Sequence, residues 1–125
     1  MTRRVGRAQT MARALTIAAD IHPVQNLRVG NYLRSQFGAD DAAVQGWSRH
    51  WIAQGFAALE AQAPASGLFG GAAPNLADIC LVPQMYNARR FELDLAPYPQ
   101  LVRIDSALRE HSAFIAAAPE SSKAA

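Results

Sequence analysis

One run of apolar residues limits the possible fold more than any other feature of the sequence. Between residues 41 and 63 the chain reads "DAAVQGWSRHWIAQGFAALEAQA". Its apolar side chains recur every three or four positions, as on one face of an α-helix, and they are Val44, Trp47, Trp51, Ile52, Phe56 and Leu59. Asp40 or Asp41 can cap this helix, because a carboxylate is favoured at a helix N-terminus. A helix with so long an apolar face has to pack against other elements.

The segment before this helix carries a second apolar stripe. Met11, Leu15, Ala18 and Ile21 recur at helical spacing, and the pattern resumes after Pro23. No segment of the chain alternates between apolar and polar residues as a half-buried strand does. The sequence therefore predicts an all-α helical bundle, with helices over residues 3–37, 41–63, 75–91, 98–110 and 112–117.

The stretch "PNLADICLVPQMYNARRF" carries the clearest helix start. Asn75 can accept from the first-turn amides while Asp78 reaches back to the Asn75 amide, which makes an Asn/Asp variant of the capping box. The residues that follow are apolar on most sides, so we expect this helix to be buried. Pro83 lies inside it and Pro23 lies inside the first helix, and each should mark a bend because proline removes a backbone donor.

Length and composition favour a single domain. The chain has 125 residues, 18% of them charged, with a formal net charge of +2, and we assign one domain to residues 1–119 and a disordered tail to 120–125. No apolar run approaches the length of a membrane span, so we expect no membrane partner. Cys80 is the only cysteine, which excludes an intrachain disulfide and fits a reducing, cytoplasmic location.

The beginning of the chain is rich in arginine. Arg3, Arg4, Arg7 and Arg13 precede the first acidic residue, Asp20. This pattern can form a phosphate-binding arm or a transit peptide, but the apolar periodicity continues from the same segment and favours a solvated helix face. Nucleic-acid binding is the weaker interpretation, because no readout or stacking groups accompany the arginines.

Several kinds of catalytic or metal site do not match this sequence. It contains no glycine-rich phosphate loop, no HExxH and no CxxC. The histidines His22, His50 and His111 lack the spacing of metal ligands, so we expect no metal. Cys80 falls on a predicted buried helix, where a small core residue is a better interpretation than a nucleophile.

Two polar clusters remain beside the prolines. In "IHPVQNLR", His22 and Asn26 are four residues apart and share a helix face. In "PQMYNARR", Gln84, Asn87 and Arg90 are three apart and form a polar stripe. Amide and guanidinium groups of this kind can bind carboxylates through paired donors. On the residues alone, an internally satisfied polar network or a solvated face is the favoured interpretation of each cluster.

The same stretches carry a family resemblance. "DIHPVQNLRV", "LADICLVPQ" and "NARRF", with the "PYP" that follows, resemble the zeta-class glutathione transferases, which include maleylacetoacetate and maleylpyruvate isomerases. The resemblance extends from about residue 5 to residue 119 and covers only the C-terminal α-helical domain of that family. The family's N-terminal thioredoxin-like domain, with its thiol-activating motif, has no counterpart in the sequence. The resemblance therefore implies no catalytic residue within this chain and a missing partner domain.

What the resemblance implies is a glutathione-dependent cis–trans isomerisation of a keto dicarboxylate. Arg28 and Arg90 then hold the substrate carboxylates, and His22 and Asn26 form a wall near glutathione, the expected cofactor. Arg89, one position from Arg90, turns away around the helix. The resemblance also implies a homodimer. It leaves maleylacetoacetate and maleylpyruvate open as substrates, and a non-catalytic interaction module is the alternative function.

Overall fold

The computed structural model describes residues 2–122 and contains only helices and loops over that range. The all-α prediction is confirmed. In chain order the elements are α1 (Arg3–Leu15), the π-helix η1 (Thr16–Ile21), α2 (His22–Val24), α3 (Leu27–Phe37), α4 (Asp41–Gln62), α5 (Leu76–Arg90), α6 (Pro99–Arg109), α7 (Ser112–Ala117) and α8 (Pro119–Ser122).

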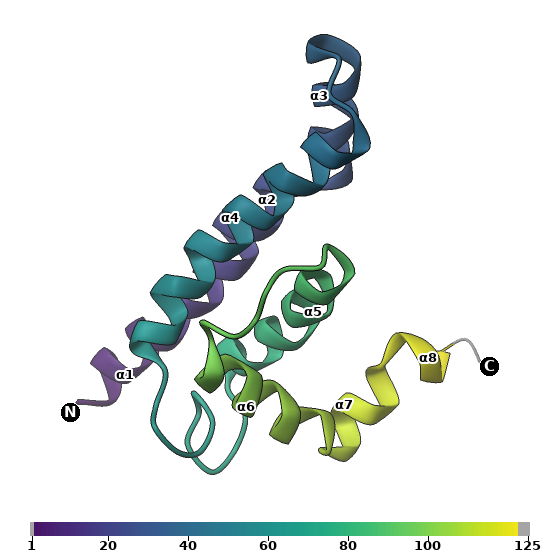
Figure 1. Cartoon of the computed structure of the whole chain (residues 1–125). Helices are drawn as coiled ribbons and strands as arrows, with labels where there is room; N and C mark the ends of the chain where they lie inside the picture. Colours follow the sequence, from purple (N-terminus) through teal and green to yellow (C-terminus); the bar gives the residue numbers. More distant parts are fainter. Residues whose placement is uncertain (1, 123–125) are drawn as a thin grey trace.

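The helices form two groups (Figure 1). The elements from α1 to α3 follow one another along a single line, and α4 returns beside them in the opposite direction. Helices α5 to α8 gather on one side of this pair, while α3 and the start of α4 project beyond them. This arrangement leaves an angle between the projecting pair and the C-terminal end of α5, where the candidate site lies.

The first predicted helix, 3–37, is not one bent helix. A π-helix, η1, precedes Pro23, and the chain leaves helical geometry at Gln25 and Asn26 rather than at the proline. Asn26 is extended (φ −66°, ψ 154°), and its side-chain oxygen accepts from the Arg28 amide at 3.3 Å. Asn26 therefore begins a new helix as its N-cap. Pro83 does not interrupt the other helix, since α5 continues through it, and the bend expected there stays a prediction.

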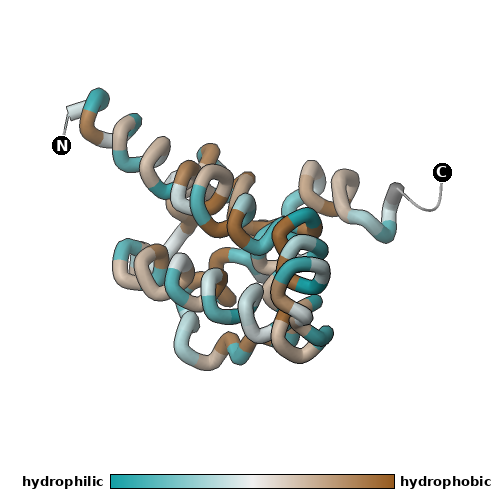
Figure 2. The backbone as a smooth tube through the Cα atoms, turned by 90° about the horizontal axis from the view of Figure 1, so that it is seen from above, coloured by the Kyte–Doolittle hydropathy of each residue, from teal (hydrophilic) through white to brown (hydrophobic). Residues whose placement is uncertain are grey.

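The core lies between η1, α4, α5 and α6. Ile52, Phe56 and Leu59 of α4 are fully buried there. Gly55 allows η1 to approach α4 closely, since a Cβ atom at that position would lie 2.2 Å from Ile21 Cδ1. In Figure 2 the hydrophobic positions, in brown, concentrate where the helices come together, and hydrophilic positions occupy many outer turns.

Helix α5 is buried on one face only. Leu81, Met85 and Ala88 are fully buried, but Ile79 remains 54% exposed. The expectation that this helix is buried therefore holds for one face only. Its outer face, with Ile79, Val82 and Tyr86, borders a second and larger cavity of about 880 Å³ against α7 and α8.

The C-terminal tail also differs from the expectation. Residues Pro119–Ser122 form α8, so 120–122 are helical rather than disordered. The expectation for 123–125 lies outside the described residues. Within the part of the chain that is described, no helix is both long and apolar enough to cross a bilayer.

The predicted cap of α5 is confirmed and has a wider role. Asn75 and Asp78 form the reciprocal capping box. The Asp78 carboxylate, fully buried, accepts from the amides of Phe69 and Gly70 as well as from Asn75, at 3.0, 2.8 and 2.9 Å. One carboxylate thus fixes both the start of α5 and the preceding loop.

Replacement of Asp78 by alanine should destabilise the fold strongly. Three amides would lose a charged acceptor where water has little access, so we expect the free energy of unfolding to fall by about 3 kcal/mol. Asp94→Ala is the matched control, because the exposed Asp94 accepts from only one amide, that of Ala96. Urea denaturation measures both, and equal losses would contradict the structural role of Asp78.

A glycine at position 92 should stabilise the protein. Glu92 follows α5 in the left-handed region (φ 57°), which glycine adopts without steric cost. Glu92→Gly should therefore raise the free energy of unfolding by about 0.5 kcal/mol. Glu110→Gly should lower it, since Glu110 ends α6 in ordinary helical geometry (φ −85°). The thermal unfolding midpoint should rise for Glu92→Gly and fall for Glu110→Gly. A change in the same direction for both variants would refute the backbone strain at Glu92.

Candidate functional site

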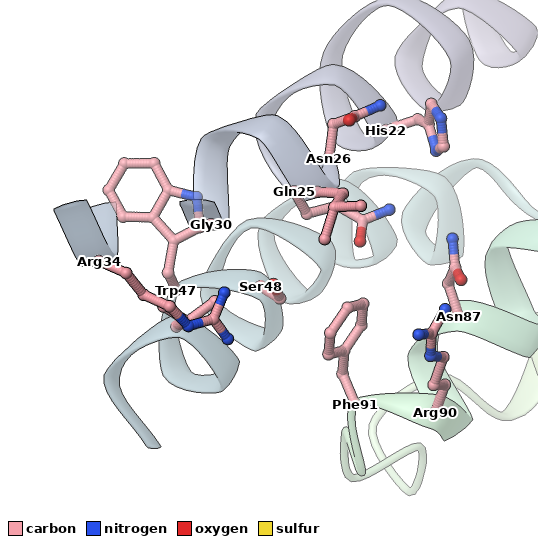
Figure 3. Close-up of a pocket in the computed structure, with 12 residues that line it drawn as sticks. His22, Gln25, Asn26, Gly30, Arg34, Trp47, Ser48, Asn87, Arg90 and Phe91 are labelled. Atoms are coloured by element: carbon pink, nitrogen blue, oxygen red, sulfur yellow. The ribbon is translucent and has the colours of Figure 1, made fainter. Parts of the chain in front are cut away.

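A cavity of about 370 Å³ lies between the α2–α3 break, α4 and the C-terminal end of α5. Figure 3 shows two walls, with His22, Gln25 and Asn26 on one and Asn87 and Arg90 on the other. The cavity is lined by His22, Gln25, Asn26, Leu27, Gly30, Arg34, Val44, Trp47, Ser48, Asn87, Arg90 and Phe91.

The first wall exists because the helix is interrupted. In a continuous helix the Val24 carbonyl would accept from the Arg28 amide, but that amide donates to the Asn26 side chain instead. The Trp47 indole of α4 donates to the Val24 carbonyl at 2.8 Å and replaces the lost bond. Gln25, only 7% exposed, is thereby held against the cavity.

The second wall is the last turn of α5. Asn87 and Arg90 are three residues apart, so they share a helix face, and both line the cavity. Arg49 of α4 donates to the Phe91 carbonyl at 3.3 Å and ties the end of α5 to the long helix pair. Phe91 lies between the two walls (Figure 3).

The structure brings most, but not all, of the predicted site residues together. His22, Asn26 and Arg90 line one cavity. Arg28 is exposed on the first turn of α3 and is not among the lining residues; its guanidinium has no hydrogen-bond or ion-pair partner within residues 2–122. Arg89 points away and binds Asp105 at 2.7 Å, as its position on the helix implies.

Other predicted polar or reactive side chains lie outside the cavity. Gln84 is 2% exposed and its Nε2 has no hydrogen-bond partner among the described residues, so the polar stripe of α5 is divided between core and cavity. Cys80 is half-buried against the core, and this burial raises the pKa of its thiol, which disfavours the nucleophilic thiolate.

The chemistry of the cavity suits an anion. Two arginines, Arg34 and Arg90, line it together with amide side chains and His22, whereas none of the lining residues is acidic. Sequence patterns gave no signal for Arg34, Trp47 or Phe91, because each reaches the cavity only through the tertiary arrangement of α3, α4 and α5. No group of three or more potential metal-ligating side chains occurs within residues 2–122.

Comparison with known proteins gives relatives that are described as maleylpyruvate or maleylacetoacetate isomerases. The chain is 47% identical to a maleylpyruvate isomerase from Ralstonia sp over 118 residues, which cover 91% of this chain and 56% of the relative. It is 42% identical to a maleylacetoacetate isomerase from Rhizobium meliloti, covering 95% of this chain and 57% of the relative. No protein-family model matches the chain.

Solved structures resemble it equally well. A holo maleylpyruvate isomerase, described as a bacterial zeta-class glutathione transferase, superposes with a TM-score of 0.92 at 44% identity, covering 97% of this chain and 59% of that one. A maleylacetoacetate isomerase from Anaeromyxobacter dehalogenans, with bound dicarboxyethyl glutathione and citrate, gives a TM-score of 0.85 at 43% identity, covering 92% and 52%.

The chain belongs to the zeta-class glutathione transferase and maleylacetoacetate isomerase family, and its fold matches the C-terminal helical region of that family. It spans about half the length of the curated relatives it matches.

The role of Trp47 in supporting the first wall predicts a difference between two tryptophans. Trp47→Phe should lower the free energy of unfolding by about 1–2 kcal/mol, because the Val24 carbonyl loses its donor. Trp51→Phe removes an indole of the same size whose Nε1 has no partner among the described residues. It should therefore lose no hydrogen-bond contribution to the free energy of unfolding. Urea midpoints distinguish the two; a larger loss for Trp51→Phe would contradict this account.

Proposed function

We propose that this chain forms the helical side of the active site of a glutathione-dependent cis–trans isomerase that acts on a dicarboxylate such as maleylacetoacetate. The observation that carries the proposal is the acid-free cavity lined by His22, Asn26, Asn87 and Arg90. A dicarboxylate entering it would meet cationic and amide donors on opposite walls. The ligand class therefore follows from the donors, and the reaction follows from the family.

The reaction places a specific demand on these donors. Glutathione, when bound, would supply a thiolate that adds reversibly to the conjugated cis double bond, which would leave a single bond free to rotate before loss of the same thiolate gives the trans product. Arg90 can bind a carboxylate and offset the negative charge that would develop on the adjoining carbonyl oxygen. We expect His22 and Asn26 to lie in the wall that faces glutathione.

Arg28 is a second proposed carboxylate ligand. It directly follows Leu27, which lines the cavity, and its guanidinium is unpaired within residues 2–122. It can therefore turn to a ligand at the rim without breaking an ion pair. This assignment is supported by accessibility, whereas that of Arg90 is supported by its place in the cavity lining.

The relatives favour the same chemistry. One Anaeromyxobacter dehalogenans structure is described with bound glutathione, and a Methylobacterium extorquens maleylacetoacetate isomerase with malonate and glutathione. We propose that a thioredoxin-like domain supplies thiol activation, because this chain matches only about half of its relatives' length. Maleylpyruvate is the alternative substrate. A cytoplasmic location and a homodimer accompany the proposal, and a non-catalytic interaction module is the competing function.

The proposal predicts that activity requires both halves of the enzyme. The chain alone should show no glutathione-dependent isomerisation of maleylacetoacetate, measured by absorbance. A fusion to the N-terminal half of the Ralstonia maleylpyruvate isomerase should restore it. An active fusion supports the isomerase assignment, while a folded, dimeric and glutathione-binding fusion that is inactive on both maleylacetoacetate and maleylpyruvate supports the interaction module.

Within the active fusion, the role of Arg90 is separable from its charge. Arg90→Lys keeps the charge but loses the planar pair of donors. Its kcat/KM should fall by a factor that corresponds to a loss of about 1–3 kcal/mol of transition-state stabilisation. Arg7→Lys is the control, since Arg7 is exposed on α1 and outside the cavity. Arg89 is unsuitable because it pairs with the buried Asp105. Equal kcat/KM for Arg90→Lys and the parent would refute the assignment.

A further inference from the structure

The cavity has a cation at each end and an aromatic ring between them. In Figure 3 the guanidinium groups of Arg34 and Arg90 lie on opposite sides of the Phe91 ring. We propose that Arg34 is the specificity-determining residue that binds the distal carboxylate of an extended dicarboxylate whose proximal carboxylate lies at Arg90. This inference rests on the proposed function, in which Arg90 binds a carboxylate, and adds a residue that the family resemblance did not indicate.

An exposed partner holds Arg34 in place without using all of its donors. Nε and Nη2 of Arg34 both donate to one Asp41 oxygen, at 3.2 and 2.9 Å. Nη1 has no hydrogen-bond partner among the described residues. Asp41 is 88% exposed and Arg34 41% exposed, so solvent weakens this ion pair. Asp41 therefore orients the guanidinium while leaving a charged donor group free for a ligand.

The free donor lies over a gap in the cavity wall. A Cβ atom built on the buried Gly30 would come within 3.5 Å of Arg34 Nη1 and 3.0 Å of Val44 Cγ1. A Cβ atom at position 30 would therefore press on Val44 and come into ordinary contact with Arg34 Nη1. Gly30 lines the cavity one turn before Arg34 on α3, so its missing side chain leaves space in the cavity wall beside Nη1.

The arrangement selects for the length and the shape of the ligand. A ligand with one carboxylate can satisfy Arg90 or Arg34, but only an extended dicarboxylate can reach both. Phe91, whose ring the Arg90 guanidinium overlies at 6.0 Å, lies between them and offers an apolar contact to a flat, conjugated segment. The favoured ligand is therefore an unsaturated dicarboxylate with its charges at the two ends.

Two dienes of equal length test this inference on the chain itself. trans,trans-Muconate carries a carboxylate at each end, and sorbate has the same six-carbon diene with one carboxylate. We expect muconate to bind about tenfold more tightly than sorbate to the parent chain, the effect of one additional charge-assisted contact. In Arg34→Gln the two affinities should become equal, because muconate loses its second contact, while sorbate loses only an alternative site and should weaken by no more than about twofold. Titrations followed by NMR give both dissociation constants, and the Gly30 amide reports occupancy near Arg34.

Arg7→Gln is the matched control, because Arg7 is exposed on α1 and outside the cavity lining. Arg28, the other proposed carboxylate ligand, is the competing candidate for the distal carboxylate. Preference for muconate that survives Arg34→Gln but disappears in Arg28→Gln would overturn the proposal and make Arg28 the distal ligand. Failure of the proposed function has a different signature: neither ligand would bind the parent chain, or both would bind Arg90→Gln unchanged. An unaltered thermal midpoint shows that Arg34→Gln retains the fold.

Discussion

The architecture of the site depends on how backbone groups are satisfied where helices are interrupted. A buried carbonyl or amide without a partner costs free energy comparable to a lost hydrogen bond. At the α2–α3 break, the Trp47 indole and the Asn26 side chain replace the missing helical bonds. At the start of α5, Asp78 does the same for three amides. These substitutions let the chain change direction and still pack closely.

This dependence couples the core to the cavity. Trp47 belongs to α4, whose next turns bury Ile52 and Phe56, while its indole supports the wall that contains Gln25 and Asn26. Arg49, on the same helix, fixes the end of α5 through the Phe91 carbonyl. Helix α4 therefore positions both walls, and the cavity is rigidly connected to the most buried part of the fold.

The sequence predicted those features that local signals determine. The expected helix over 41–63 is Asp41–Gln62 in the structure, and the capping box at Asn75 is present, because periodicity and caps act within a few residues. Pro23 correctly indicated that the first helix is not regular, but the interruption does not fall at the proline. The break falls at Asn26, where a side-chain cap and a tryptophan 21 residues later in the chain make it favourable.

The composition of the site was predictable only in part. The motifs identified His22, Asn26 and Arg90, which the fold brings together. Arg34 could not be found from sequence, since its role depends on Asp41 across the α3–α4 turn and on the space above Gly30. Spacing along a helix indicates which residues share a face, but it does not indicate which face borders a cavity.

The most direct test of the dicarboxylate site is a crystal structure of this chain with trans,trans-muconate. We expect a ligand in the cavity between the α2–α3 break and the end of α5, with a carboxylate on the Arg90 guanidinium and the diene against Phe91. Muconate bound elsewhere, with the cavity empty and Arg90 turned to solvent, would contradict the claim that these two walls form a dicarboxylate site.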